Sequence, residues 1–386
     1  MAAIPTDIHE QELFDIAQGL IRVNSENPLT TEEKAAIYVR DVLSLHGIHA
    51  AFSWAAPGRP NVIVRLSGRK PGRTLLYSGH LDVVPAGEGW SVDPFAAVIV
   101  GDRLIGRGAA DMKSGVAAMM YAAIVLKRRG LEAGELILHF SVGEERGMFG
   151  MQQFLADQIS ADFAIVGEPT NLDVCIGHRG TCRYRVNVSG TPGHAAFVAD
   201  PDNAIYNMAR LLPGLEQLGL AIKKRSHPIL GNASLTVTQI RGGTAPNIIP
   251  GFCEIEIDRR VLPGETRETM LEEFEQYVSN LAGDQALTYS IDNYSFVPAS
   301  LIDPDHPFVH HTSDAAARIL QKPSEIKAFK ATCEAPFFSL YRGIPTLICG
   351  PGSLEQAHVI DEYVELREVV EAAALYVELA ESLLHE

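Results

Sequence analysis

Five short apolar runs in this chain each lead into a histidine or an acidic residue. Short apolar runs bounded by turn residues are typical of strands in a sheet that is covered on both faces. Open α/β sheets bind ligands just outside the carboxyl ends of their strands. The pattern therefore predicts an α/β sheet with polar side chains gathered at one edge, and these are His80, Asp111, Glu145, Glu168 and His358.

Two imidazoles and three carboxylates form a ligand set that suits two divalent metal ions, with one carboxylate shared between them. Glu144 lies directly beside Glu145, and because adjacent side chains diverge it stays free to act as a general base. Two metal ions ~3.5–4 Å apart would acidify a water and polarise a carbonyl, which makes amide hydrolysis the natural reaction. The sequence thus predicts a two-metal hydrolase.

Each residue also has a plain structural explanation when it is considered alone. His80 and Asp82 form an H-x-D pair that could be a surface turn, Asp111 could cap a helix, and His358 could be a structural histidine. The joint pattern favours the metal site. In that site Asp82 is placed to accept the second N–H of His80 and so to orient its ring.

Composition limits the partners of the chain. The 386 residues suggest two or three domains, and a formal charge of −16 argues against nucleic acid and anionic membranes as partners. The five cysteines are scattered and odd in number, so a disulfide framework is not expected. No signal peptide and no run near the ~18 apolar residues of a membrane span are apparent, so we expect a cytoplasmic protein.

Two kinds of pattern alternate along the chain. Residues 1–178 and 295–386 read as one discontinuous α/β domain, with a mixed sheet flanked by helices that carries the metal site. Residues 179–294 contain strands with period-two alternation and two helical stretches, which predicts an inserted α+β domain with an antiparallel sheet. The insert would serve as a lid and a dimerisation domain.

At these residues the sequence resembles the zinc-dependent amidohydrolase and exopeptidase family of acetylornithine deacetylase, succinyl-diaminopimelate desuccinylase, aminoacylase and glutamate carboxypeptidase. The resemblance covers nearly the whole chain. Its motifs occur in the family order: GHLDVVP, GRGAADMKSG, GEERG, GEPT, SGTPGHAA, GGTAPNIIP, DRRVLPG and GPGSLEQAHVIDEY.

The resemblance implies a role for each matching residue. It assigns His80 and Glu168 to one metal ion and Glu145 and His358 to the other, with Asp111 bridging, Glu144 as general base and Asp82 orienting His80. His194 in the insert would stabilise the oxyanion, often from the partner subunit of a homodimer. Asn247 and Arg260 would bind substrate, because a guanidinium suits a substrate carboxylate. Zinc is the expected metal, with cobalt or manganese as alternatives.

The closing segment most resembles acetylornithine deacetylases, which implies removal of an acetyl group from an N-acyl amino acid. The chain departs from the family pattern near the expected substrate pocket, at Thr332-Cys333, at Val359-Ile360 and after His194. A desuccinylase, an aminoacylase, an exopeptidase or a carbamoyl-amide hydrolase therefore stays open as an alternative. A non-catalytic binding protein is a remote alternative, because such a protein would be expected to have lost a ligand or the base.

Overall fold

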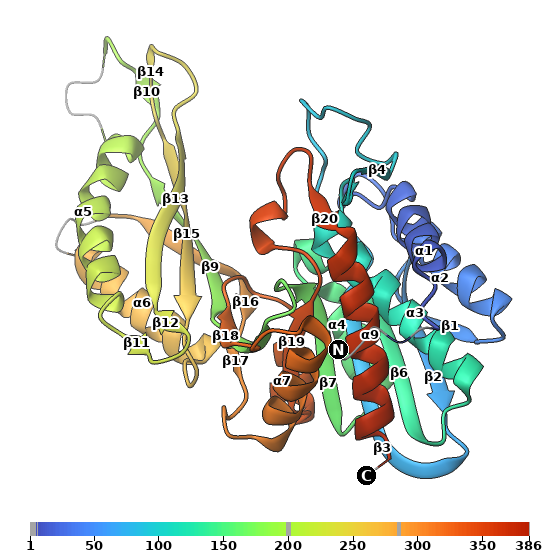
Figure 1. The fold of residues 1–386 in the computed structure, drawn as a ribbon. Coiled ribbons are helices and arrows are strands. Elements are labelled where there is room, and N and C mark those ends of the chain that lie inside the picture. The colour runs from blue at the N-terminus through green and yellow to red at the C-terminus, as the bar shows by residue number, and fades with distance from the viewer. Residues whose placement is uncertain (1–4, 6, 198–201, 284–286, 386) are drawn as a thin grey trace. The chain divides into compact units, whose positions relative to one another are not determined.

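The computed structural model describes residues 5, 7–197, 202–283 and 287–385 (Figure 1). The chain divides into two compact units, Met1–Gly177 with Leu301–Glu386, and His178–Ser300. The sequence places the second boundary at 294/295, which falls inside strand β16 (Tyr289–Val297). The observed boundary lies at 300/301 because that strand continues past the expected end.

The first unit is built on a mixed sheet that has nine strands among the described residues. The order is β1-β2-β6-β3-β7-β19-β8-β17, and β18 pairs with β8. The central strands β6, β3, β7 and β19 run parallel, whereas β1, β2 and β8 are antiparallel to their neighbours. The strands are β1 (Ala50–Ala56), β2 (Arg59–Ser67), β3 (Lys70–His80), β6 (Ala133–Ser141), β7 (Phe163–Pro169), β8 (Val174–His178), β17 (Ser300–Leu301), β18 (Ile326–Phe329) and β19 (Thr346–Gly350).

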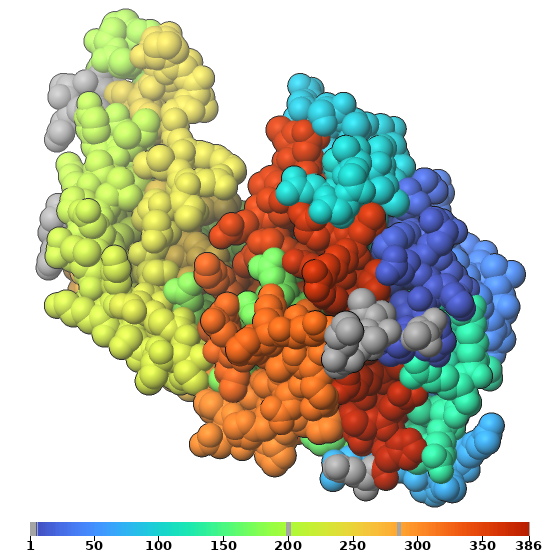
Figure 2. All heavy atoms as spheres, viewed as in Figure 1, coloured from blue at the N-terminus to red at the C-terminus, as the bar shows by residue number. Residues whose placement is uncertain are grey.

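Helices flank this sheet, which confirms the predicted fold class. Helix α9, drawn in red, packs against α3, α7 and α1, so the C-terminal helix lies beside segments from three other parts of the chain (Figures 1 and 2). The short helices α4 and α8 contact each other. Helix α4 also packs against β1 and β2, and α8 packs against β19. The helices of this unit are α1 (Glu10–Arg22), α2 (Glu33–Leu45), α3 (Ser114–Arg129), α4 (Phe149–Asp157), α7 (Pro307–Leu320), α8 (Ala335–Arg342) and α9 (Leu366–Leu383).

Among the described residues, one helical segment is long and apolar enough to cross a membrane by length and composition alone. It is Ala109–Arg129, which has a mean hydropathy of 1.3 in its best window although Asp111, Lys113 and Ser114 interrupt its apolar residues. The whole window is buried inside the protein, packed against the sheet and α9. Burial on all sides removes the polar face that would otherwise interrupt its apolar composition.

A small sheet lies next to the main one in the first unit. It has the order β20-β5-β4, formed by Tyr363–Glu365, Arg103–Ile105 and Val98–Val100. Strand β20 follows the segment that carries His358, and β5 precedes the turn that carries Asp111. The small sheet therefore joins the two segments that supply these residues.

The second unit combines an antiparallel sheet with two helices among its described residues, as the sequence predicts. The sheet order is β13-β15-β9-β16, and β13 is a strand that the sequence pattern did not indicate. Two short pairs, β10-β14 and β11-β12, complete it. Its elements are β9 (Gly180–Ser189), β10 (Gly193–His194), α5 (Ala204–Ile222), β11 (Ser226–His227), β12 (Gly231–Asn232), β13 (Ser234–Gly242), β14 (Ile248–Ile249), β15 (Phe252–Val261), α6 (Arg267–Gly283) and β16.

Candidate metal centre

The parallel strands of the first unit end at one edge of the sheet and present polar side chains there. His80 is the last residue of β3 and pairs with Ser141, the last residue of β6. A single helical turn, Glu144–Arg146, follows β6 and carries Glu145. Glu168 lies near the end of β7, and the loop after β19 carries His358. The chain therefore delivers four of the five predicted ligands from the carboxyl ends of adjacent strands.

Asp111 reaches the same edge from an irregular turn that precedes α3. The turn begins after Gly108, whose φ of +86° is readily adopted by glycine, and Asp111 itself has extended angles (φ −121°, ψ 96°). Regular helix starts only at Ser114. The extended backbone leaves the Asp111 side chain outside the helical spiral, directed at the two histidines.

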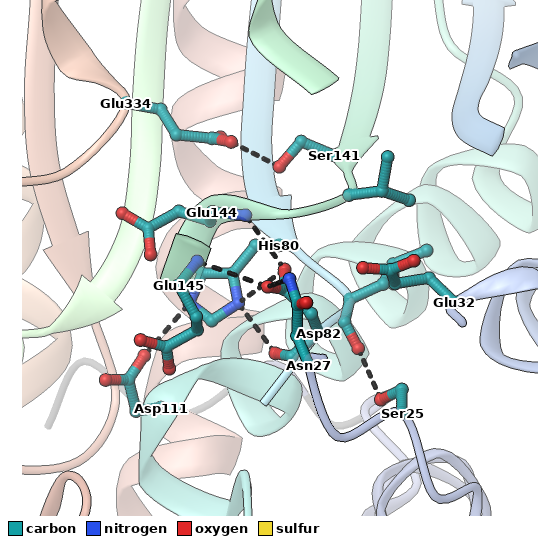
Figure 3. Close-up of polar contacts among 12 residues, drawn as sticks. Ser25, Asn27, Glu32, His80, Asp82, Asp111, Ser141, Glu144, Glu145 and Glu334 are labelled. Carbon is teal, nitrogen blue, oxygen red and sulfur yellow. Dashed lines mark hydrogen bonds and ion pairs between the residues drawn. The ribbon is translucent and has the colours of Figure 1, made fainter. Parts of the chain in front are cut away.

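The two oxygens of Asp111 face different imidazoles. Oδ1 lies 3.0 Å from His80 Nε2, and Oδ2 lies 3.4 Å from His358 Nε2. His358 Nε2 is also 3.0 Å from Glu145 Oε1, and His80 Nε2 is 4.0 Å from Glu168 Oε1. The structure thus brings all five residues into one cluster, part of which is drawn in Figure 3, with Asp111 between two histidine–glutamate sets.

The electrostatics of the cluster favour bound cations. Burial opposes the charge on His80, yet its pKa is raised well above the ordinary value because Asp111 accepts its hydrogen bond and acidic groups surround it. Hydrogen bonds to Asp111 and Glu145 raise the pKa of His358 to about 10. Burial raises the pKa of Glu168 well above its usual range, and neighbouring Asp111 adds to the effect.

The raised pKa values of the two histidines mean that the cluster favours positive charge at these positions. Donor atoms of His80, Asp111 and Glu145 all lie within 4.8 Å of one another, which is close enough for metal coordination at this cluster. Imidazole nitrogen and carboxylate oxygen suit zinc, cobalt and manganese. The residues present fit a divalent metal centre.

Glu144 occupies a distinct environment beside this cluster. Its side chain is partly buried, and removal from water raises its pKa well above the ordinary value, with nearby Glu168, Glu145 and Glu334 adding to the effect against the opposing charge of His80. A carboxyl group whose pKa is raised in this way can accept a proton near neutral pH and give it up again.

Asp82 acts on the cluster in a way that the sequence did not reveal. His80 Nδ1 donates to the main-chain carbonyl of Asp82 at 2.9 Å, whereas the nearer carboxylate oxygen lies 3.7 Å away. The Asp82 carboxylate instead accepts the backbone N–H groups of Glu144 and Glu145, each at 3.1 Å, and one from the Asn27 side chain (Figure 3). Asp82 therefore holds both the imidazole and the acidic turn.

A second buried group lies behind the ends of β3 and β6. Glu334 is 1% exposed and accepts a hydrogen bond from Ser141 (Figure 3). It also accepts one from Ser78 at 3.4 Å. Ser78 also contacts His139, which is buried against Phe154 and Phe338. Glu334 is therefore held behind the strand ends by two serine hydroxyls.

The three other predicted residues belong to the second unit. His194 in β10 pairs with Ile248 in β14, and Ala195 donates its N–H to the carbonyl of Asn247, so His194 and Asn247 are exposed neighbours where these two strands meet. Arg260 is partly exposed and bonds Asp258 and Thr181 on the antiparallel sheet. Its neighbour Arg259 is fully buried and paired with Glu265 and Glu273, so Arg260 is the more accessible of the two guanidiniums.

Residues 76–382 match the Peptidase family M20/M25/M40, and the chain belongs to this family of hydrolases. An acetylornithine deacetylase of Vibrio cholerae is 31% identical over 364 residues, covering 91% of this chain and 93% of the relative. An acetylornithine deacetylase of Vibrio parahaemolyticus is 33% identical over 367 residues, with the same two coverages.

Solved structures share the fold at lower identity. A metallo-carboxypeptidase of the M20 family from Sulfolobus solfataricus has a TM-score of 0.83 at 17% identity, covering 97% of this chain and 100% of the other. A dinuclear metal-binding M20 peptidase from Bacillus subtilis has a TM-score of 0.73 at 18% identity, covering 97% and 98%. These likenesses confirm the mixed α/β fold with its inserted unit.

Proposed function

We propose that this protein hydrolyses the amide bond of an N-acyl amino acid, with N-acetylornithine as the first substrate to test. The observation that carries the proposal is Asp111, whose two oxygens face His80 and His358 separately, with Glu144 beside the cluster. The curated relatives named acetylornithine deacetylase support the acetyl group and the amino acid class.

In this proposal His80 and Glu168 would hold one ion, Glu145 and His358 would hold the other, and Asp111 would be shared. Zinc is the first choice, and cobalt and manganese are alternatives because the ligands are nitrogen and oxygen. Bound ions would lower the pKa of a water and polarise the amide carbonyl.

The chain's own groups would then move the protons and position the substrate. Glu144 accepts a proton from the attacking water and delivers it to the leaving nitrogen. Asp82 fixes the turn from which Glu144 acts, through the backbone N–H group at 3.1 Å. His194 donates a hydrogen bond to the developing oxyanion. Asn247 and Arg260 bind the substrate, and the guanidinium of Arg260 pairs with the carboxylate of the substrate.

Amine release from a substrate panel tests this function. The panel contains N-acetylornithine, succinyl-diaminopimelate, other N-acetyl amino acids and a dipeptide, each with added zinc or cobalt and with chelator. Metal-dependent turnover that is strongest on N-acetylornithine would support the proposal. Strongest turnover on the dipeptide would favour an exopeptidase, and metal binding without turnover on any amide would favour a binding protein.

We also propose a homodimer that forms through the second unit. Strand β13 is an edge of the antiparallel sheet, and Ile240 on it is 54% exposed. An apolar groove of about 640 Å³ runs between β13 and α5, beside the exposed Leu220. An open strand edge with apolar flanks is a surface on which a second copy can pair. Sedimentation of the protein and of Ile240→Lys tests it, since only the variant should be monomeric.

A cytoplasmic location is part of the same proposal. All five cysteines are free thiols, which suits a reducing compartment. Fractionation of cells that express the full chain would locate it.

A further inference from the structure

Glu362 is a buried carboxylate that contacts the backbone of the segment carrying Asp111. It is 0% exposed and lies four residues after His358, directly before β20. Its Oε1 accepts the backbone N–H groups of Ala110 at 2.8 Å and Asp111 at 3.0 Å. Its own carbonyl accepts the N–H of Gly106 at 2.9 Å. Glu362 is therefore bonded at several points along the strand and turn that lead to Asp111.

The turn at Asp111 needs such a partner. Asp111 has extended backbone angles just before α3, so its N–H group cannot bond within a helix. Ala110 is fully buried and Asp111 is 8% exposed, which places both N–H groups away from bulk water. A buried N–H group without an acceptor is costly, so one carboxylate oxygen that serves two N–H groups fixes the orientation of this peptide.

Arg107 holds the other oxygen of the same carboxylate. Its Nη1 lies 2.6 Å from Glu362 Oε2, and its guanidinium is 2% exposed, 5.1 Å from the ring centre of Trp90. The positive charge of Arg107 compensates a negative group placed close to the acidic cluster. Glu362 can thereby remain an acceptor although Asp111 is near.

We propose that Glu362, held by Arg107, is the positioning residue that sets the direction of the Asp111 carboxylate between the two metal ions. The inference rests on the proposed metal site. It also means that one segment, residues 358–362, supplies a metal ligand in His358 and the support of the shared ligand. Partners of this kind behind a metal ligand typically contribute a factor of ~10–100 to metal affinity or activity.

Glu362→Gln tests this, because it keeps the size of the side chain and removes its charge. Glu365→Gln is the matched control, since Glu365 pairs with Arg103 across the same two strands, β20 and β5, but on the exposed surface. Zinc affinity is measured by calorimetry, the absorption spectrum of the cobalt-loaded protein is recorded, and kcat and KM are determined at saturating metal.

For Glu362→Gln we expect zinc affinity to fall by roughly 10–100-fold, the cobalt spectrum to change, and kcat to fall while KM stays within about twofold. Glu365→Gln should match the wild type in all three. If Glu362→Gln does not fold, Arg107→Lys gives the same test, because lysine keeps the charge but cannot reproduce the two-pronged contact with Glu362 and the Ala86 carbonyl.

Two other results would overturn the inference in distinguishable ways. The Glu362→Gln protein could have a lower melting temperature but the zinc affinity and cobalt spectrum of the wild type. That result would mean that Glu362 and Arg107 form an ion pair that stabilises the fold without positioning Asp111. Failure of the wild type itself to bind zinc or cobalt would remove the metal site, and this inference with it.

Discussion

Asp82 shows how a single residue can support the centre through its main chain and its side chain at once. The H-x-D spacing predicts a contact with His80, and a contact exists, but the carbonyl makes it at 2.9 Å. The carboxylate is directed at the N–H groups of Glu144 and Glu145. Spacing along a strand can indicate that two residues are near each other, whereas it cannot indicate which atom makes the bond.

Replacement of Glu144 by glutamine should abolish most activity and leave the metal content intact. Glutamine keeps the shape of the side chain but cannot accept the proton, so we expect kcat to fall by at least ~10²-fold, the usual weight of a general base. Metal analysis and turnover of the same preparation check this. Glu145→Gln, one residue further along the turn, should instead lower metal affinity. A nearly fully active Glu144→Gln would exclude Glu144 as the base.

Glu334 should make the stability of the metal-free protein depend on pH. Burial raises the pKa of Glu334 to about 7 from the ordinary value of 4.5, so the folded protein retains a proton that the unfolded chain releases at lower pH. Stability then falls as pH rises from about 4.5 to about 7 and changes little above that range. The loss of folding stability from this titration is at most roughly 3 kcal/mol, as calculated from the size of the pKa shift of Glu334.

Glu334→Gln removes this titration, because an amide stays neutral at every pH. We expect the variant to gain stability relative to the wild type between pH 5 and pH 8, as measured by denaturant unfolding with chelator present. Chelator is needed because bound cations change the pKa of nearby carboxyls. A constant difference between the two proteins across this range would contradict the titration of Glu334.

The sequence could predict the five proposed ligands because each of them follows an apolar run or a glycine-rich turn along the chain. It could not predict Glu362 or Glu334 as supports. Glu362 bonds a backbone N–H group 252 residues away, and Glu334 bonds Ser141, 193 residues away. A local sequence pattern cannot indicate contacts between residues so far apart in the chain, although Glu362 does lie inside the motif that contains His358.

At the scale of elements, the turn after β6 determines where Glu144 and Glu145 point. Gly143 has a φ of +72°, and a Cβ on it would lie 1.8 Å from the ring of Phe149. Gly147 closes the same turn with a φ of +97°, and nothing lies within 4 Å of its Cβ position. The two glycines share a left-handed backbone but differ in the space around them, which makes them a matched pair.

Gly143→Ala should therefore loosen the metal centre, whereas Gly147→Ala should not. Both carry the backbone strain of a left-handed residue, about 1–2 kcal/mol. Only the first must displace Phe149, and with it the turn, so we expect its zinc affinity to fall by at least ~10-fold. Calorimetric titration and thermal unfolding of both variants check this. Equal zinc affinity in the two would show that the turn tolerates the displacement.

The strands of the two sheets were predictable from the sequence to different degrees. The buried parallel strands β3, β6 and β7 are apolar runs, and β15 alternates strictly between buried and partly exposed residues except at its first position, so each leaves a clear pattern. Strand β13 was not expected because most of its residues are exposed or half-buried, with one buried residue among nine. Helix α5 packs against this strand, but most of the side chains of β13 stay at the surface, so its sequence shows no alternation between buried and exposed residues.

At the scale of the whole molecule, the chain leaves the first unit and returns to it at adjacent strands. Strands β8 and β17 are neighbours in the main sheet, and Ile302 donates its N–H to the carbonyl of Ile176 at 2.9 Å. The inserted residues thus replace what would otherwise be a short connection between two strands. The five proposed metal ligands all lie in the first unit, and His194, Asn247 and Arg260 all lie in the second.

This division predicts that metal binding and catalysis can be separated by deletion. Replacing residues 179–299 by a short glycine-serine linker keeps the main sheet, the five ligands and Glu144, so we expect two metal ions per chain in calorimetry. Amide hydrolysis should fall by at least ~10²-fold, because the proposed oxyanion donor and the substrate contacts are absent. The full-length His194→Ala protein is the control, which should bind metal and lose most of its kcat. A deleted protein that keeps its helical circular dichroism but binds no metal would show that the centre needs the insert, and one that keeps full turnover would remove His194, Asn247 and Arg260 from the reaction.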